Sequence, residues 1–103
     1  LTFETVANIE KSDSATIYID KETLKLPLTV RHWQEGDYFY PLGMQGKKKL
    51  SKYFKDQKLS LIDKEKVLLL CSQDKIVWVI NHRADDRFKV TNQTKSILKI
   101  KLS

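Results

Sequence analysis

The stretch from residue 67 to residue 81, VLLLCSQDKIVWVIN, constrains the fold more than any other part of this chain. Two apolar runs flank the polar segment SQDK, a pattern that is typical of a β-hairpin. The first run, residues 67–71, is apolar at every position, and strands of that kind are covered on both faces. We therefore expect other elements to pack on either side of this hairpin.

The alternation of side chains predicts further strands before and after the hairpin. Residues 2–8 and 15–19 are rich in Thr, Val, Ile and aromatic residues, and a polar turn separates them. Residues 26–33 are also predicted to form a strand, because their side chains would give its two faces different chemical character. Residues 87–91 and 96–102 alternate apolar with basic side chains, as half-exposed strands do.

Between these strands the sequence favours a loop followed by two short helices. The loop, residues 34–46, holds all three glycines and one of the two prolines of the chain. Residues 47–58 have the apolar spacing of a helix. One face of this helix carries Leu50, Tyr53, Phe54 and Gln57, and another carries Lys48, Lys52 and Lys55. A second helix is predicted at residues 60–66, because Ser60 and Asp63 have the spacing of an N-terminal cap.

The order of these elements predicts an α+β domain, because strands come first, then a helix pair, then strands again. The sheet is expected to be mostly antiparallel and to form a sandwich-like core, with the two helices in the middle of the sequence. A length of 103 residues suits a single domain, residues 1–103, and an apolar content of 41% is enough to build its core.

Composition narrows the class of partner. The formal net charge is +6 and the isoelectric point is near 9.4, which favours an anionic partner such as RNA, DNA or a membrane surface. The apolar run at residues 67–71 is too short to cross a bilayer, and the chain starts at Leu1 without a charged-then-apolar leader. The single cysteine, Cys71, excludes an internal disulfide and is expected to be a small core residue. These features predict a piece of a longer cytoplasmic protein with no membrane partner.

The lysine-rich stretch that begins at Gly46 does not match a phosphate-binding P-loop. Lys48 stands where that motif needs Ser or Thr, and Pro41 stands where it needs its first glycine. Two interpretations remain open. An anion can bind beside the helix start, since Gly43 and Gly46 permit close approach of the backbone and the lysines at residues 47–49 attract it. Alternatively, the lysines form an ordinary solvated helix face.

Aromatic side chains surround the lysine-rich stretch, and unpaired bases can stack on such side chains. The set comprises Trp33, Tyr38, Phe39, Tyr40, Tyr53 and Phe54. Most of them are expected to pack in the core or in turns. Tyr38 and Tyr40 flank the loop and are the best candidates for exposure.

No catalytic or metal-binding pattern is evident. Asp85 and Asp86 lie near His82 and Arg83, but adjacent aspartates on a strand point to opposite faces, and a metal site needs more ligands. We interpret this segment as a turn with local ion pairs. The sequence contains no Ser–His–Asp order, no Cys/His cluster and no paired acid–base glutamates, so we expect no catalytic residue, metal or cofactor site in this chain.

An ordered set of features between residues 28 and 88 resembles the C-terminal domain of bacterial tRNA(Ile)-lysidine synthase. The features are Arg31, the pair Gly36 and Asp37, the loop glycines Gly43 and Gly46, the run KKL at residues 48–50, a hydrophobic strand, and a strand ending in WV ahead of Arg83. The chain departs from the family pattern at Glu35, Val67 and Asn81, where the family often has proline, proline and glycine.

The resemblance implies a function that spacing alone does not show. Enzymes of this family adenylate the wobble cytidine of an isoleucine tRNA with ATP and then join lysine to it, forming lysidine. Their Ser-Gly-Gly-x-Asp-Ser loop for ATP does not occur in this chain. ATP, Mg²⁺ and lysine are therefore expected to bind other domains of the full-length enzyme. The resemblance also implies a sandwich-like fold, related to part of the large subunit of phenylalanyl-tRNA synthetase.

We therefore expect a non-catalytic tRNA-binding domain of a larger ligase, with the acceptor stem of tRNA(Ile) as the region held. The expected RNA-binding residues are Arg31, Gly43, Gly46, Lys47, Lys48, Lys49, Lys52, Lys55 and Arg83. Lysines suit contacts with phosphates, and such contacts position an RNA without specifying its sequence. Discrimination between RNAs would therefore need other residues, and Arg31, Arg83 or Tyr38 are the candidates. The alternatives are an interaction or homodimerisation domain of the same enzyme, a general RNA-binding module, and a free-standing enzyme.

Overall fold

The computed structural model describes residues 1–102, and in this range three antiparallel sheets accompany two α-helices and two short 3₁₀ helices. The first sheet has the order β1-β8-β2, made of Thr2–Val6, Ile97–Lys101 and Thr16–Asp20. The second has the order β3-β6-β7, made of Leu28–His32, Leu68–Ser72 and Lys75–Val79. The third pairs β4, Tyr38–Phe39, with β5, Lys48–Lys49. The helices are η1, Lys21–Thr23; α1, Leu50–Asp56; α2, Leu61–Lys66; and η2, Asp86–Phe88.

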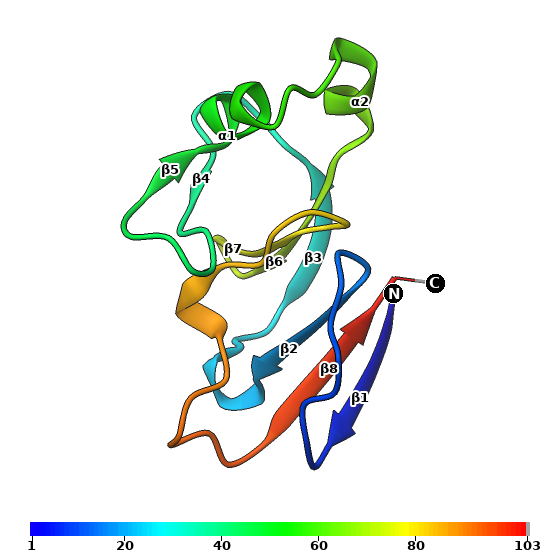
Figure 1. Cartoon of the computed structure of the whole chain (residues 1–103), viewed down its shortest axis with the longest axis vertical. Coiled ribbons are helices and arrows are strands. Elements are labelled where there is room, and N and C mark those ends of the chain that lie inside the picture. Colours follow the sequence, from blue (N-terminus) through cyan, green and yellow to red (C-terminus); the bar gives the residue numbers. More distant parts are fainter. Residues whose placement is uncertain (103) are drawn as a thin grey trace.

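The hairpin β6–β7 is the middle layer of the molecule. Figure 1 shows it between the first sheet, at the lower end, and the two α-helices, at the upper end. Leu70 belongs to the core shared with the first sheet, whereas Leu69 and Cys71 belong to the core under α1. These three side chains are at most 1% exposed. The predictions of a strand covered on both faces and of a buried Cys71 are confirmed.

A β-bulge explains how the unbroken apolar run of β7 is accommodated. The pairing passes from Leu70 opposite Trp78 to Cys71 opposite Ile76, so Val77 is the extra residue. As a result, the neighbours Val77 and Trp78 both lie in the core between the two large sheets. Strict alternation would have placed one of them on the other face.

β7 is followed by a residue in the left-handed conformation. Asn81 has a φ of 65°, and asparagine is one of the few residues other than glycine that adopt this conformation readily. Asn81 therefore keeps the backbone conformation that a glycine would permit.

The prediction of an α+β fold with mostly antiparallel pairing is confirmed, and so is the second helix. Ser60 caps α2, since its side-chain oxygen accepts the backbone N–H of Asp63 at 3.0 Å. The predicted start of the first helix at Lys47 was wrong. Lys48 and Lys49 instead pair with β4, which lies inside the predicted loop, and α1 begins only after them.

The strand predicted at residues 87–91 was also wrong, because η2 occupies its start. The carboxylate of Asp85 accepts the backbone N–H of Arg87 at 2.8 Å and stabilises this short helix. Such local bonds from side chain to backbone compete with strand pairing. Lys89 retains an isolated bridge to Ile19 of β2.

Candidate nucleic-acid interface

Several of the predicted lysines line one hollow beside α1, which we call the lysine pocket. It has a volume of about 510 Å³ and is lined by Pro41, Met44, Gln45, Gly46, Lys47, Lys48, Lys49, Lys52 and Asp56. Four ammonium groups thus face a single carboxylate. A concave surface with such a charge excess attracts and concentrates anions.

The lysines of this pocket come from the end of the loop, from β5 and from α1, and not from one helix face. Lys48 lies on β5 and Lys52 on α1. The expectation that Lys48, Lys52 and Lys55 share a helix face was therefore wrong, because Lys48 precedes the helix. Lys55 is exposed on α1 but does not line the pocket.

Asp56 neutralises one of these charges. Its carboxylate forms an ion pair with Lys48, whose side chain is 19% exposed. The hydrogen bond from Lys48 is the main cause that lowers the pKa of Asp56 below its ordinary value; burial opposes it, and the charges of Lys48, Lys52 and Lys55 add to the lowering. Asp56 is therefore ionised at neutral pH, and Lys48 is engaged with it.

The other three lysines of the pocket keep their charge available. Within residues 1–102, no ion pair links Lys47, Lys49 or Lys52 to an acid. All three side chains are exposed. Lys47 lies over the ring of Tyr38, with its Nζ atom 4.4 Å from the ring centroid. These three residues are the ones best placed to meet an anion.

The start of α1 does not itself offer a free backbone donor at its first residue. The N–H of Leu50 donates to the carbonyl oxygen of Asp37 at 2.9 Å, and Lys49 in the N-cap position makes no side-chain cap. α1 has seven residues. The N–H of the first helical residue is therefore not available to an anion, whereas the lysine side chains are.

The aromatic residues divide between core and surface, but of the two predicted to be exposed only Tyr38 is so. Phe39, Tyr53 and Phe54 are at most 3% exposed, whereas Tyr38 is 43% exposed. Tyr40 is half-buried and contacts Tyr38 edge to face, with ring centroids 6.2 Å apart. Tyr38 is therefore an exposed aromatic surface next to the lysine pocket.

Gly43 and Arg83 lie together on the other side of the loop at residues 41–46. Arg83 Nη1 donates to the carbonyl oxygen of Leu42 at 2.8 Å, and a Cβ atom at Gly43 would lie 4.0 Å from the same Nη1. Gly43 has a φ of +81°, a conformation that favours glycine. This contact fastens the loop to the segment that follows β7.

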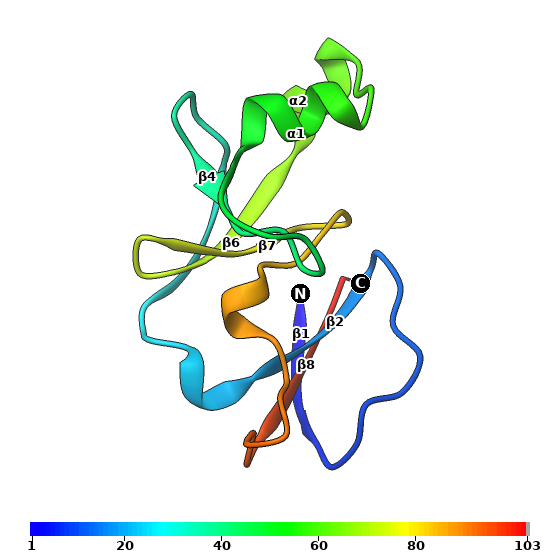
Figure 2. The ribbon, with the colours of Figure 1, turned by 60° about the vertical axis from the view of Figure 1, so that its left-hand side comes forward.

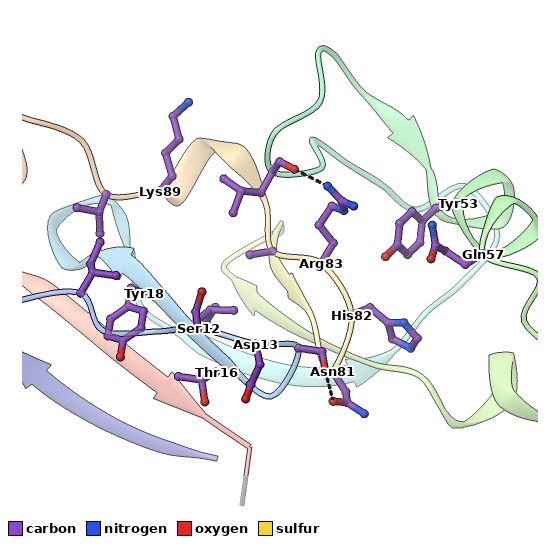
Figure 3. A pocket seen from close by; sticks show the side chains of 16 residues that line it. Ser12, Asp13, Thr16, Tyr18, Tyr53, Gln57, Asn81, His82, Arg83 and Lys89 are labelled. Atoms are coloured by element: carbon purple, nitrogen blue, oxygen red, sulfur yellow. Dashed lines mark hydrogen bonds between the residues drawn. The ribbon is translucent and has the colours of Figure 1, made fainter.

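Arg83 also lines a groove that is larger than the lysine pocket; it runs between the first sheet and α1 and has a volume of about 660 Å³. Figure 3 shows Arg83 and His82 on one side of it and Tyr18 and Thr16 on the other. Leu42 lines this groove, whereas other residues of the same loop line the lysine pocket. The loop at residues 41–46 is thus the wall between the two depressions.

Arg31 lies apart from the lysine pocket and has a structural partner. Its two terminal nitrogens donate to the Asp37 carboxylate at 2.9 and 3.0 Å, and Asp37 also accepts the backbone N–H of Gln34 at 2.7 Å. Asp37 in turn holds the start of α1 through its carbonyl oxygen. Arg31 therefore supports the site by positioning the strand and helix that carry the lysines.

This pair predicts a specific loss of stability in acid. Burial alone would raise the pKa of Asp37, but the bonds from Arg31 and from Gln34 outweigh it and lower that pKa below its ordinary value. The pair thus stabilises the fold fully above the pKa of the unfolded chain, and this contribution is lost as pH falls through the lower folded pKa. We expect Asp37→Asn to lower the free energy of unfolding by about 1–2 kcal/mol at neutral pH. We also expect a flatter decline of that free energy below ~pH 4.

Urea unfolding from ~pH 7 down to ~pH 2.5 measures both effects. Glu10→Gln is the matched control, since Glu10 is an exposed carboxylate with no ion pair in the described part of the chain. If the free energy of unfolding fell equally steeply with decreasing pH in Asp37→Asn and in the control, the role given to the pair would be contradicted.

The acidic segment near His82 has the ion pairs that were predicted from the sequence. Asp85 pairs with Arg87 at 2.9 Å, and Asp86 pairs with Lys89 at 3.2 Å. In the range 1–102, no group of three or more His, Cys, Asp or Glu side chains is placed to hold a metal ion. In the same range, no helix has the length and apolar character needed to cross a membrane.

Comparisons with known proteins agree with this architecture. A family model described as the TilS substrate C-terminal domain matches residues 28–101. The tRNA(Ile)-lysidine synthase of Parabacteroides distasonis is 54% identical over 81 residues, which is 79% of this chain and 18% of that protein. The tRNA(Ile)-lysidine synthase of Bacteroides thetaiotaomicron is 39% identical over 90 residues, which is 87% of this chain and 21% of that protein. The chain thus spans about a fifth of the length of these relatives.

Two solved structures share the fold. The crystal structure of a TilS C-terminal domain has a TM-score of 0.78 and 24% identity, covering 95% of this chain and 77% of that one. An N-terminal fragment of the phenylalanyl-tRNA synthetase β-subunit from Pyrococcus horikoshii has a TM-score of 0.67 and 18% identity, covering 82% of this chain and 26% of that one. Both likenesses support the sandwich-like α+β fold.

Proposed function

Because the chain belongs to the family of TilS substrate C-terminal domains, we propose that it is a tRNA-binding domain of a tRNA(Ile)-lysidine synthase. The full-length enzyme would use ATP to join lysine to the wobble cytidine of tRNA(Ile) in the cytoplasm. The sites for ATP, Mg²⁺ and lysine would belong to its other domains. This chain would contribute affinity for the tRNA and no catalytic group.

The lysine pocket is the observation that carries this proposal. Lys47, Lys49 and Lys52 are exposed and without an acidic partner in the described residues, and they converge on one hollow. Folded RNA is recognised largely through its shape, its phosphates and its 2′-hydroxyls. Lysine ammonium groups are mobile point charges that suit such contacts. The acceptor stem, a duplex with closely spaced phosphates, is the part of tRNA(Ile) that we assign to this pocket.

Binding of the isolated domain to tRNA(Ile) over a range of salt concentrations tests the proposal. Each lysine that neutralises a phosphate contributes about 0.7–0.9 to the slope of log affinity against log salt, so three lysines predict a slope steeper than about −2. Fluorescence anisotropy with labelled tRNA(Ile) and with a generic RNA hairpin measures this slope and the preference. Equal affinity for both RNAs would favour a general RNA-binding module. Absence of salt-dependent binding would refute the proposal.

An interaction surface is the second candidate function, and exposed apolar residues on α2 favour it. Leu61 is 70% exposed and Ile62 is 64% exposed. Exposed neighbours of this kind are suited to contact a second copy of the chain or another domain of the same enzyme. Sedimentation of the wild type and of a Leu61→Ser/Ile62→Ser variant tests self-association, and a monomer in both would exclude the homodimer.

A further inference from the structure

A second basic hollow lies at the turn between β6 and β7, and we call it the turn pocket. It has a volume of about 250 Å³ and is lined by Thr23, Lys25, Ser72, Gln73, Lys75, Arg87 and Phe88. Three of these side chains are cationic, and in the described part of the chain none of the lining residues is acidic. Lys25 and Lys75 are exposed. The pocket is therefore a cationic surface distinct from the lysine pocket.

The walls of the turn pocket are held by hydrogen bonds that join distant parts of the chain. The side-chain oxygen of Ser72 accepts the N–H of Lys25 at 2.7 Å and donates to the carbonyl oxygen of Lys25 at 2.8 Å. Gln73 donates to the carbonyl oxygens of Leu26 and Pro27, each at 3.0 Å. Figure 2 shows the β6–β7 turn and the segment leading into β3 on the same side of the molecule. Because this backbone is fixed, less entropy is lost when a ligand orders the two lysines.

Arg87 is the third cation of the turn pocket and is fixed by its neighbours. Its Nε and Nη2 atoms donate to the carboxylate of Asp85 at 3.0 and 2.9 Å. Its guanidinium carbon lies 4.4 Å from the centroid of the Tyr40 ring. Arg87 is largely neutralised by Asp85, so Lys25 and Lys75 supply the available charge.

Two aromatic rings, with a cation at either end, join the two pockets. Lys47 of the lysine pocket lies over Tyr38, Tyr38 contacts Tyr40 edge to face, and Tyr40 lies under Arg87 of the turn pocket. A smaller hollow of about 150 Å³ lies along the same path, and its lining includes Tyr38, the cations Lys75 and Arg87, and the acids Asp37 and Asp74. The two pockets are therefore joined by the rings of Tyr38 and Tyr40, along a path that carries both cations and acids, of which Asp37 is already paired with Arg31.

We propose that the turn pocket is a second phosphate-binding site, and that the RNA seated in the lysine pocket extends to it along the row of Tyr38 and Tyr40. The ligand chemistry is that of a phosphodiester, held by Lys25 and Lys75. This inference rests on the proposed tRNA-binding function and enlarges its contact surface. Neither lysine lies in the lysine-rich stretch of the sequence.

The double variant Lys25→Ala/Lys75→Ala tests the second site in the isolated domain. Loss of two phosphate contacts is expected to reduce the steepness of the salt dependence by about 1.4–1.8 and to weaken tRNA(Ile) binding roughly 30-fold at ~0.1 M salt. Lys11→Ala/Lys95→Ala is the matched control, since it removes two exposed lysines outside both pockets and changes the net charge equally. Fluorescence anisotropy gives the affinities, and urea unfolding verifies that both variants fold.

Each outcome separates this inference from the function on which it rests. If the wild type fails to bind tRNA(Ile), both proposals are wrong. If it binds and the Lys25/Lys75 variant binds equally well, or loses no more affinity than the control, only the second site is wrong. Amide shifts at residues 72–75 on addition of inorganic phosphate, without any effect of the variant on tRNA binding, would identify a site for free anions and would also overturn the inference.

Discussion

Replacement of Lys47, Lys49 and Lys52 by alanine together is expected to weaken tRNA(Ile) binding about 10²-fold at ~0.1 M salt. Each of these ammonium groups would neutralise one phosphate and release a counterion, so the steepness of the salt dependence should fall by about 2–3. Lys48 is left in place because it is engaged with Asp56, and its removal would leave that carboxylate unpaired among the remaining charges.

The control for this triple variant is Lys11→Ala/Lys95→Ala/Lys101→Ala. These three lysines are exposed and lie outside both pockets, so the control changes the net charge by the same amount. Anisotropy titrations at several salt concentrations compare the two variants. A similar loss in both would show that the overall charge of the domain, and not the lysine pocket, attracts the RNA. Unchanged binding in the triple variant would contradict the proposed interface.

Removal of the Asp85 side chain is expected to cost about 3–5 kcal/mol in the free energy of unfolding. Its carboxylate is fully buried and accepts four hydrogen bonds: one from the N–H of Tyr40, and three from the N–H, Nε and Nη2 of Arg87. In Asp85→Ala the part-buried N–H of Tyr40 and the guanidinium of Arg87 lose their acceptor. Since small domains are stable by only about 5–15 kcal/mol, this is a large fraction of the total.

Asp86→Ala provides the comparison for this prediction. Asp86 pairs with Lys89 at the surface, with side chains 33% and 49% exposed, and such pairs contribute less than about 1 kcal/mol. Urea unfolding measures both variants, and Asp85→Asn, which keeps one carbonyl acceptor, serves if Asp85→Ala does not fold. Equal losses of stability in the Asp85 and Asp86 variants would show that burial of the carboxylate has no special role.

Local patterns predicted most of the fold. The hairpin followed from two apolar runs around a polar turn, and α2 followed from the spacing of Ser60 and Asp63, because both depend on residues close in sequence. The errors arose where a contact from elsewhere competed with local preference. Lys48 and Lys49 fit the helical spacing of the residues that follow them, but their backbone pairs with β4.

Local sequence likewise indicated part of the candidate site, namely the lysines that are neighbours in the chain. Lys47, Lys49 and Lys52 are close in sequence, so any compact fold of this stretch brings them near one another. The engagement of Lys48 by Asp56 and of Arg31 by Asp37 was not evident, because a charge pattern does not show which cations have acidic partners in the fold.

The sequence alone determined the class of fold, the covered central strand and the excess of positive charge, since composition and short-range periodicity encode burial and net charge directly. The tertiary structure alone decided which cations lie together. Lys25 and Lys75 are far apart in the chain, and they share a pocket because Ser72 and Gln73 bind the backbone of residues 25–27. A hydrogen bond between segments 47 residues apart has no signature in local spacing, because it depends on how the strands around it pair.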